Sequence, residues 1–169
     1  KHAPLLEPWQ RELVRIVRKV AQYFYPQRQT QVMNEGWATF WHHRILNTMY
    51  DDGHLTDGVM IEWLKSHTNV VYQPRVGERG YSGLNPYALG FSMYTDLKRV
   101  CEKPTDEDRE WFPEIAGKPW LETLDHAMRN FKDESFVGQY LSPRLMRELR
   151  LFAITDDEDD DELEVSAIH

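Results

Sequence analysis

The sequence QTQVMNEGWATFWHHRILNTMY, residues 29–50, decides the fold that we predict for this chain. Its bulky apolar residues recur every three to four positions, which is typical of a helix with a wide buried face. They are Met33, Trp37, Phe40, Trp41, Leu46 and Met49. A polar line follows the same helix at i, i+4, i+7 and i+8: Glu35, Thr39, His42 and His43. Because polar groups are costly to bury without partners, this line is the candidate functional site.

Glu35 is the first candidate for chemistry, because its carboxylate lies among aromatic residues and needs a cation, a metal ion or several donors. The next residue, Gly36, costs a helix about 1 kcal/mol relative to alanine. Its presence indicates that a neighbouring helix or a ligand approaches closely at this point. Two interpretations of Glu35 stay open: a metal ligand or general base, or a carboxylate paired with Arg44 or Arg15.

The two histidines extend this candidate site. Seven residues separate Glu35 from His42, a rise of about 10 Å along a helix, which is too far for both to bind one metal ion unaided. We therefore predict His42 as a proton donor or substrate contact beside a catalytic Glu35. His43 points about 100° away and is predicted to be the solvated or the hydrogen-bonded one of the pair. Both histidines could equally be satisfied core residues.

Four polar residues are predicted to contact a substrate: Asn34, His43, His67 and Tyr87. Asn34 adjoins Glu35, and His67 belongs to a second polar cluster after the third predicted helix. Tyr87 follows Asn85, whose position before a proline is itself explained by helix capping.

A set of longer motifs points to a family. The string NEGWATFWHHRI, with QYFYPQRQT before it and SHTNVVYQP, YSGLNPYALGF, MRNFKDESF and LEVSAIH after it, resembles the SpoVR-like family, the stage V sporulation protein R group. Members of that family are much longer, so the resemblance implies an internal piece of a longer protein. It also implies a role in forming or remodelling the spore cortex, with peptidoglycan as substrate class. In bacteria that do not sporulate, it implies a stress role with a PrkA-type serine kinase and its von Willebrand-like partner.

The short string EGWA resembles the segment that carries the glutamate ligand in several zinc-dependent peptidase-like families. Their two histidine ligands come from an HExxH helix, and this chain contains no HExxH. The resemblance therefore implies a metal-dependent hydrolase, amidase- or peptidase-like, in which Glu35 binds zinc or another divalent metal and the histidines lie in an N-terminal part. The alternative is a non-catalytic assembly or regulatory protein that acts with the kinase.

The rest of the chain predicts a mainly α fold, a helical bundle around the central helix at about 30–50. Other helices are predicted over 8–25, 58–67 and 85–101, from 105, over 120–131 and 135–141, and from 142. Pro26 is predicted to end the first helix and Thr30 to cap the central one. The arginines of the first helix form a solvated face or a clamp for a substrate carboxylate. NVVYQP is predicted to be an extended segment or an edge strand, and the glycine-rich residues 75–86 are predicted to border a cleft.

Residues 149–169 differ in character from the helical domain predicted for 1–148. LRLFAIT and LEVSAIH flank the string DDEDDDE, a pattern that predicts a β-hairpin with an acidic connection, continuing into a sheet in the missing C-terminal region. The acidic block is typical of a solvated loop, with a divalent-cation loop as the alternative. It lacks the glycine and the alternate spacing of an EF-hand loop.

Composition limits the function classes. The 169 residues include 20 basic and 28 acidic ones, and eight of the acids lie between Asp156 and Glu164, so the remainder is neutral. Nucleic acid is therefore not predicted as a partner. The sequence has no signal peptide and no apolar run of membrane-spanning length. The single cysteine, Cys101, rules out an intrachain disulfide and predicts a cytoplasmic location.

Overall fold

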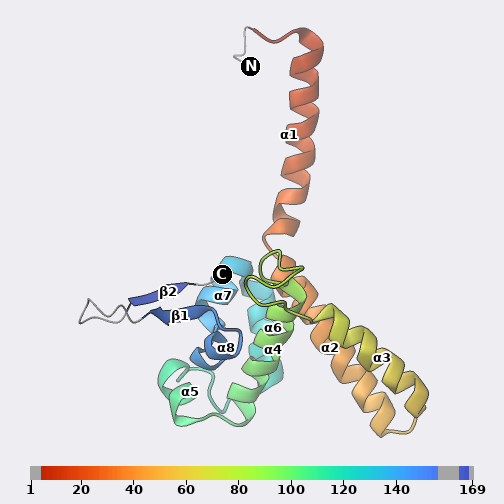
Figure 1. Ribbon diagram of the computed structural model, residues 1–169, viewed down its shortest axis with the longest axis vertical. Helices are drawn as coiled ribbons and strands as arrows, with labels where there is room; N and C mark the ends of the chain where they lie inside the picture. The colour runs from red at the N-terminus through yellow and green to blue at the C-terminus, as the bar shows by residue number, and fades with distance from the viewer. Residues whose placement is uncertain (1–4, 156–163, 168–169) are drawn as a thin grey trace.

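The computed structural model describes residues 5–155 and 164–167. Its elements in chain order are α1 (Pro8–Arg28), α2 (Gln31–Asp51), α3 (Asp57–Val70), α4 (Pro86–Glu102), α5 (Asp106–Trp111), α6 (Trp120–Asn130), α7 (Asp133–Tyr140), α8 (Pro143–Glu148), β1 (Phe152–Thr155) and β2 (Glu164–Ala167). The predicted mainly helical class is confirmed (Figure 1). No helix in the described part of the chain is both long and apolar enough to cross a membrane.

Helices α2 and α4 cross with their backbones in contact. A Cβ atom added to Gly36 would lie 2.5 Å from the carbonyl carbon of Gly90, and one added to Gly90 would lie 2.6 Å from the Cα of Gly36. Only glycine fits at both positions, because such distances are shorter than real Cβ contacts. The prediction that Gly36 marks the close approach of a neighbouring helix is therefore confirmed.

The hydrophobic core surrounds this crossing and is completed by α6, α7 and α8. Its most deeply buried large side chains are Met33, Met93, Tyr94, Val100, Leu124 and Phe136. The rings of Tyr94 and Phe136 pack with centroids 5.0 Å apart. The predicted buried face of the central helix is only partly correct. Met33 and Phe40 are buried, but Met49 is 36% exposed, since the C-terminal half of α2 extends beyond the body.

Helix α1 does not join the predicted bundle. None of its residues is buried, and it extends away from the body (Figure 1). The prediction that Pro26 ends this helix is wrong: α1 continues to Arg28. The Pro26 carbonyl accepts from the backbone N–H of Gln29, so the proline lies within the last turn.

Helix α3 lies beside the projecting half of α2 (Figure 1). It runs to Val70, three residues past the predicted end, so the predicted extended segment NVVYQP begins inside a helix and no strand forms there. Met60 and Trp63 are buried, whereas Val59 and Leu64 are 50% and 41% exposed, because α3 contacts the body along one narrow face.

Helix caps explain where several helices begin. The side chains of Asn85, Thr105 and Ser142 accept hydrogen bonds from the first turns of α4, α5 and α8, as predicted. Thr30 occupies the N-cap position of α2, but its side chain makes no capping bond. Asp133 of α7 supplies the cap instead, because its carboxylate accepts hydrogen bonds from the backbone N–H groups of Val32 and Met33, each at 2.9 Å.

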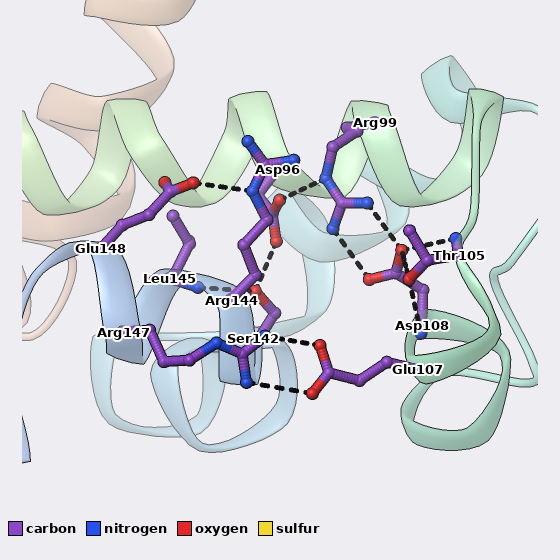
Figure 2. A network of polar contacts seen from close by, with 10 residues as sticks. All are labelled: Asp96, Arg99, Thr105, Glu107, Asp108, Ser142, Arg144, Leu145, Arg147 and Glu148. Atoms are coloured by element: carbon purple, nitrogen blue, oxygen red, sulfur yellow. Dashed lines mark hydrogen bonds and ion pairs between the residues drawn. The ribbon is translucent and has the colours of Figure 1, made fainter.

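A buried ion network fastens α4 to α5 and α8 (Figure 2). The Arg99 guanidinium donates to both carboxylate oxygens of Asp108, at 2.6 and 2.8 Å, and to Asp96 at 2.7 Å. Asp96 also accepts from the hydroxyl of Ser142 at 2.6 Å. The Arg99 hydrogen bond, followed by those from the backbone and hydroxyl of Thr105, holds the pKa of Asp108 well below its usual range.

Strands β1 and β2 pair antiparallel, with Phe152 opposite Ala167 and Thr155 opposite Glu164. The predicted acidic connection, residues 156–163, lies outside the described residues. The hairpin as a whole and its continuation into a larger sheet therefore stay predictions.

Candidate functional site

Glu35 and Tyr87 meet where α2 passes the first turn of α4. The half-buried Glu35 carboxylate accepts a hydrogen bond from the Tyr87 hydroxyl. This bond, more than burial, raises the pKa of Tyr87 above its ordinary value, because it stabilises the protonated phenol. Neither of the predicted alternative partners takes this place, since Arg15 pairs with Glu12 and Arg44 lies 4.7 Å from the ring centre of Trp120.

A polar cleft of about 430 Å³ opens beside Glu35 at the junction of α1 and α2. Its lining is rich in carboxamides and contains one guanidinium: Phe24, Gln27, Arg28, Gln31, Asn34 and Glu35. The Asn34 carboxamide donates to the hydroxyl of Thr30 at 3.0 Å, which fixes its orientation. Two residues predicted for the site, Asn34 and Glu35, are thus brought to one cleft. We refer to it as the α1–α2 cleft.

A second, smaller cleft of about 260 Å³ lies between α2, α3 and the start of α4. It is lined by Ala38, Thr39, His42, Ser66, His67, Val70 and Tyr87. Three predicted site residues, His42, His67 and Tyr87, are therefore neighbours. Because Tyr87 also bonds to Glu35, this phenol connects the two clefts. Thr39 turns its hydroxyl back to the Glu35 carbonyl at 2.6 Å, so that hydroxyl donates to the backbone of its own helix.

His43 lies in a ring cluster behind this second cleft. Its ring centroid is 4.9 Å from His67, 5.5 Å from Trp63 and 5.3 Å from Phe91. Burial lowers the pKa of His43, and the positive charge of Arg44 adds to this effect. Burial likewise lowers the pKa of His67. Electrostatic repulsion from His43, and then from His42, lowers it further.

Of the two predicted alternatives for His43, solvated or hydrogen-bonded, the solvated one is wrong. His42 is exposed and His43 is half-buried, because α3 and α4 cover the side of α2 that carries His43. Within the same ring cluster, the indole N–H of Trp63 is buried, and it has no hydrogen-bond acceptor among the described residues. Such donors usually find a partner when buried, so this one, like the indole N–H of Trp41, is an exception within the described residues.

The metal site predicted at Glu35 is not complete within the described residues. Over 5–155 and 164–167, no three His, Cys, Asp or Glu side chains gather closely enough to hold a metal ion. Glu35 and His42 face different clefts, in keeping with their separation along the helix. Further ligands for a metal at Glu35 would have to come from elsewhere.

Sequence reasoning missed the residues that α1 contributes to the site, Gln27 and Arg28. Their signal was weak, because both lie between Pro26, which was predicted to end the first helix, and Thr30, which was predicted to cap the next one. Near His67 in the sequence, Tyr72 is 59% exposed, and its backbone carbonyl accepts a hydrogen bond from the Asn85 carboxamide. Cys101 is buried and burial raises the pKa of its thiol, which does not favour a nucleophilic thiolate.

Comparison with known proteins identifies the family. The family model described as SpoVR like protein matches residues 1–169. The chain belongs to the SpoVR-like family. It is 64% identical over 169 residues to a protein of Escherichia coli (strain K12) that bears the name Uncharacterized protein YcgB. The SpoVR-like chain is covered completely in that match but spans only 33% of the length of YcgB. No solved structure matches this SpoVR-like chain.

Proposed function

We propose that this SpoVR-like chain is the substrate-binding part of a cell-wall hydrolase acting on peptidoglycan, or on its precursors, during spore cortex formation or wall remodelling. The observation that supports this proposal is the placement of Glu35. Its carboxylate borders the polar α1–α2 cleft and accepts a hydrogen bond from Tyr87, which also lines the second cleft. A half-buried carboxylate beside a cleft of polar groups is suited to general acid or base work.

The residues around Glu35 have separate roles in this proposal. Arg28 supplies a cation for a substrate carboxylate, and the carboxamides of Gln31 and Asn34 supply donors and acceptors for amide groups. Tyr87 holds the Glu35 carboxylate in place by donating to it. His42 and His67 line the second cleft and contact the remainder of the substrate.

A divalent metal such as zinc belongs to the proposal only with ligands from outside the described residues, because no three His, Cys, Asp or Glu side chains among these residues could hold it. When bound, such a metal would supply an activated water as nucleophile. The single buried cysteine fits the cytoplasm as the compartment that we propose.

The test uses the full-length protein, peptidoglycan fragments and elemental analysis of bound metal. Glu35→Gln should lower the hydrolysis rate at least about 100-fold, since it removes the acid–base group and leaves the shape. Glu62→Gln, an exposed carboxylate on α3, is the matched control and should leave the rate unchanged. Equal hydrolysis rates in both variants, or no hydrolysis by the parent protein, would contradict the proposed hydrolase activity.

A second candidate is a non-catalytic assembly or regulatory protein that acts with a PrkA-type serine kinase. It is favoured by the ring packing of His43 and His67 against Trp63 and Phe91, which resembles a structural core more than an open site. In that case, Glu35→Gln should leave kinase binding intact in a pull-down with the purified kinase. A variant that disrupts the ring cluster, Trp63→Ala, should weaken binding together with stability.

A further inference from the structure

Helix α1 exposes a continuous apolar face that nothing in the described structure covers. Its large apolar side chains are Trp9 (62% exposed), Leu13 (52%), Val14 (58%), Ile16 (47%), Val17 (65%), Val20 (49%) and Phe24 (47%). Most of the stability of helices in proteins comes from tertiary packing of their apolar face rather than from intrinsic propensity. The exposure is therefore the main unsatisfied feature of the fold.

The width of this face indicates what kind of surface covers it. At about 100° per residue, the apolar side chains cover roughly half of the helix circumference. A two-stranded coiled-coil seam is narrower than that, whereas a helix buried in a globular core has such a wide stripe. The opposite half carries Arg11, Arg15, Arg18 and Lys19, all exposed, so it is the solvent side.

The length of the polypeptide outside the structure identifies the occupant. This chain spans 33% of YcgB, so about two thirds of a protein of that length lie outside it. A segment on the same polypeptide is present at high effective concentration, which favours it over a second copy or a separate partner. We propose that the remaining polypeptide of the full-length protein packs against the apolar face of α1.

This packing completes the candidate site. Phe24 belongs both to the apolar face and to the lining of the α1–α2 cleft, where it lies with Arg28 and Glu35. A segment that covers the face at Phe24 therefore becomes a wall of that cleft. The cleft is then a composite of this chain and the remaining polypeptide, which is where further groups for Glu35 would come from. Only this last step rests on the proposed function.

Hydrogen exchange on the full-length protein tests the proposal. In the parent protein, the amides of α1 should exchange at least about 100-fold more slowly than those of an unpacked helix, at a rate independent of protein concentration. Val17→Glu places a charge on the covered face and should speed this exchange at least about tenfold. Arg18→Glu introduces the same residue on the opposite side and should leave exchange unchanged.

The parent measurement decides the question even where a variant folds poorly. Fast exchange throughout α1 in the parent protein, beside slow exchange in α4, would overturn the proposal. Protection that appears only at concentrations where light scattering shows a dimer would assign the face to a second copy. Protection that appears only with vesicles containing phosphatidylglycerol would assign it to an anionic membrane. Loss of hydrolysis in Glu35→Gln is measured separately, so failure of the enzyme proposal leaves this result standing.

Discussion

At the scale of single residues, two glycines determine how the main helices pair. Gly36 and Gly90 let the backbones of α2 and α4 touch, and this contact places Tyr87 against Glu35. A side chain at either position would force the helices apart and move Tyr87 away from the carboxylate. The geometry of the candidate site therefore depends on the absence of two Cβ atoms.

Gly36→Ala should lower the free energy of unfolding by about 1–3 kcal/mol, because its methyl group would meet the backbone of Gly90. Gly138→Ala is the control, since nothing lies within 4 Å of a Cβ at that helical position. Gly138→Ala should raise the free energy of unfolding by about 0.4–1 kcal/mol, because alanine reduces the conformational entropy of the unfolded chain. Urea unfolding of both variants measures the difference, and a stabilised Gly36→Ala would disprove the close contact.

The lowered pKa values of His43 and His67 predict a dependence of stability on pH. Below the ordinary value of 6.5, the unfolded chain binds more protons than the folded one. The free energy of unfolding should therefore be highest above that value and fall as the solution is acidified through it. Replacing both histidines by glutamine should flatten this dependence.

The matched control replaces His54, which is exposed and lies away from the ring cluster. Urea unfolding at about pH 7.5 and pH 5 measures each protein, a range that brackets the titration of histidine. An unchanged pH dependence in the double variant would mean that the two rings are not responsible for it.

At the scale of elements, α2 depends on a cap from a helix far away in sequence. Asp133 accepts from the N–H groups of Val32 and Met33, and its own N–H donates to the Gln29 carbonyl at 2.8 Å. A carboxylate at a helix N-terminus satisfies free donors and complements the helix dipole. The start of α2, and with it the α1–α2 cleft, is therefore tied to α7.

Asp133→Ala should cost about 1–2 kcal/mol of unfolding free energy, the usual effect of removing a cap. Glu134→Ala is the control, because the Glu134 side chain is 90% exposed and makes only a 3.9 Å pair with Lys132. Thermal unfolding of both variants would measure the effect. Equal melting temperatures would show that Asp133 does not hold the helix.

The ion network that joins α4 to α5 gives a second prediction at this scale. Asp108→Ala leaves Arg99 partly buried without its bidentate partner and should cost about 3–5 kcal/mol. Asp125→Ala removes an exposed pair with Arg129 and should cost no more than about 0.5 kcal/mol. Chemical denaturation compares the two, and a cost as small for Asp108→Ala as for the control would contradict the network.

At the scale of the whole molecule, the described residues form a body with one projecting helix. Helix α1 buries none of its residues, whereas α2 and α4 supply most of the core (Figure 1). The body therefore does not depend on α1 for its hydrophobic stabilisation, and the contribution of α1 lies in the cleft that it borders.

Deleting residues 1–28 from this chain should change the melting temperature by less than about 4 °C, equivalent to about 1 kcal/mol for a protein of this size. The reason is that the deletion removes no buried side chain. Near-ultraviolet circular dichroism, followed as the two chains are heated, would measure both melting temperatures. A much larger fall would mean that α1 packs on the body in solution.

The sequence by itself determined the features that depend on neighbouring residues. The caps at Asn85, Thr105 and Ser142 involve groups within three residues of each other, and the helical periodicity extends over a few turns. Such local patterns are visible in one stretch of sequence, which is why the mainly helical class and the central helix were predicted correctly. The glycine beside Glu35 also indicated a close contact, although not its partner.

Only the tertiary structure decided which distant groups meet. The bond from Tyr87 to Glu35, the cap of Asp133 on α2 and the contact of Gly36 with Gly90 join residues 50 or more positions apart. The half-buried place of His43 and the exposure of α1 likewise follow from how helices pack. Packing depends on the complementary shapes of whole elements, and no periodicity within one segment encodes which surface it will face.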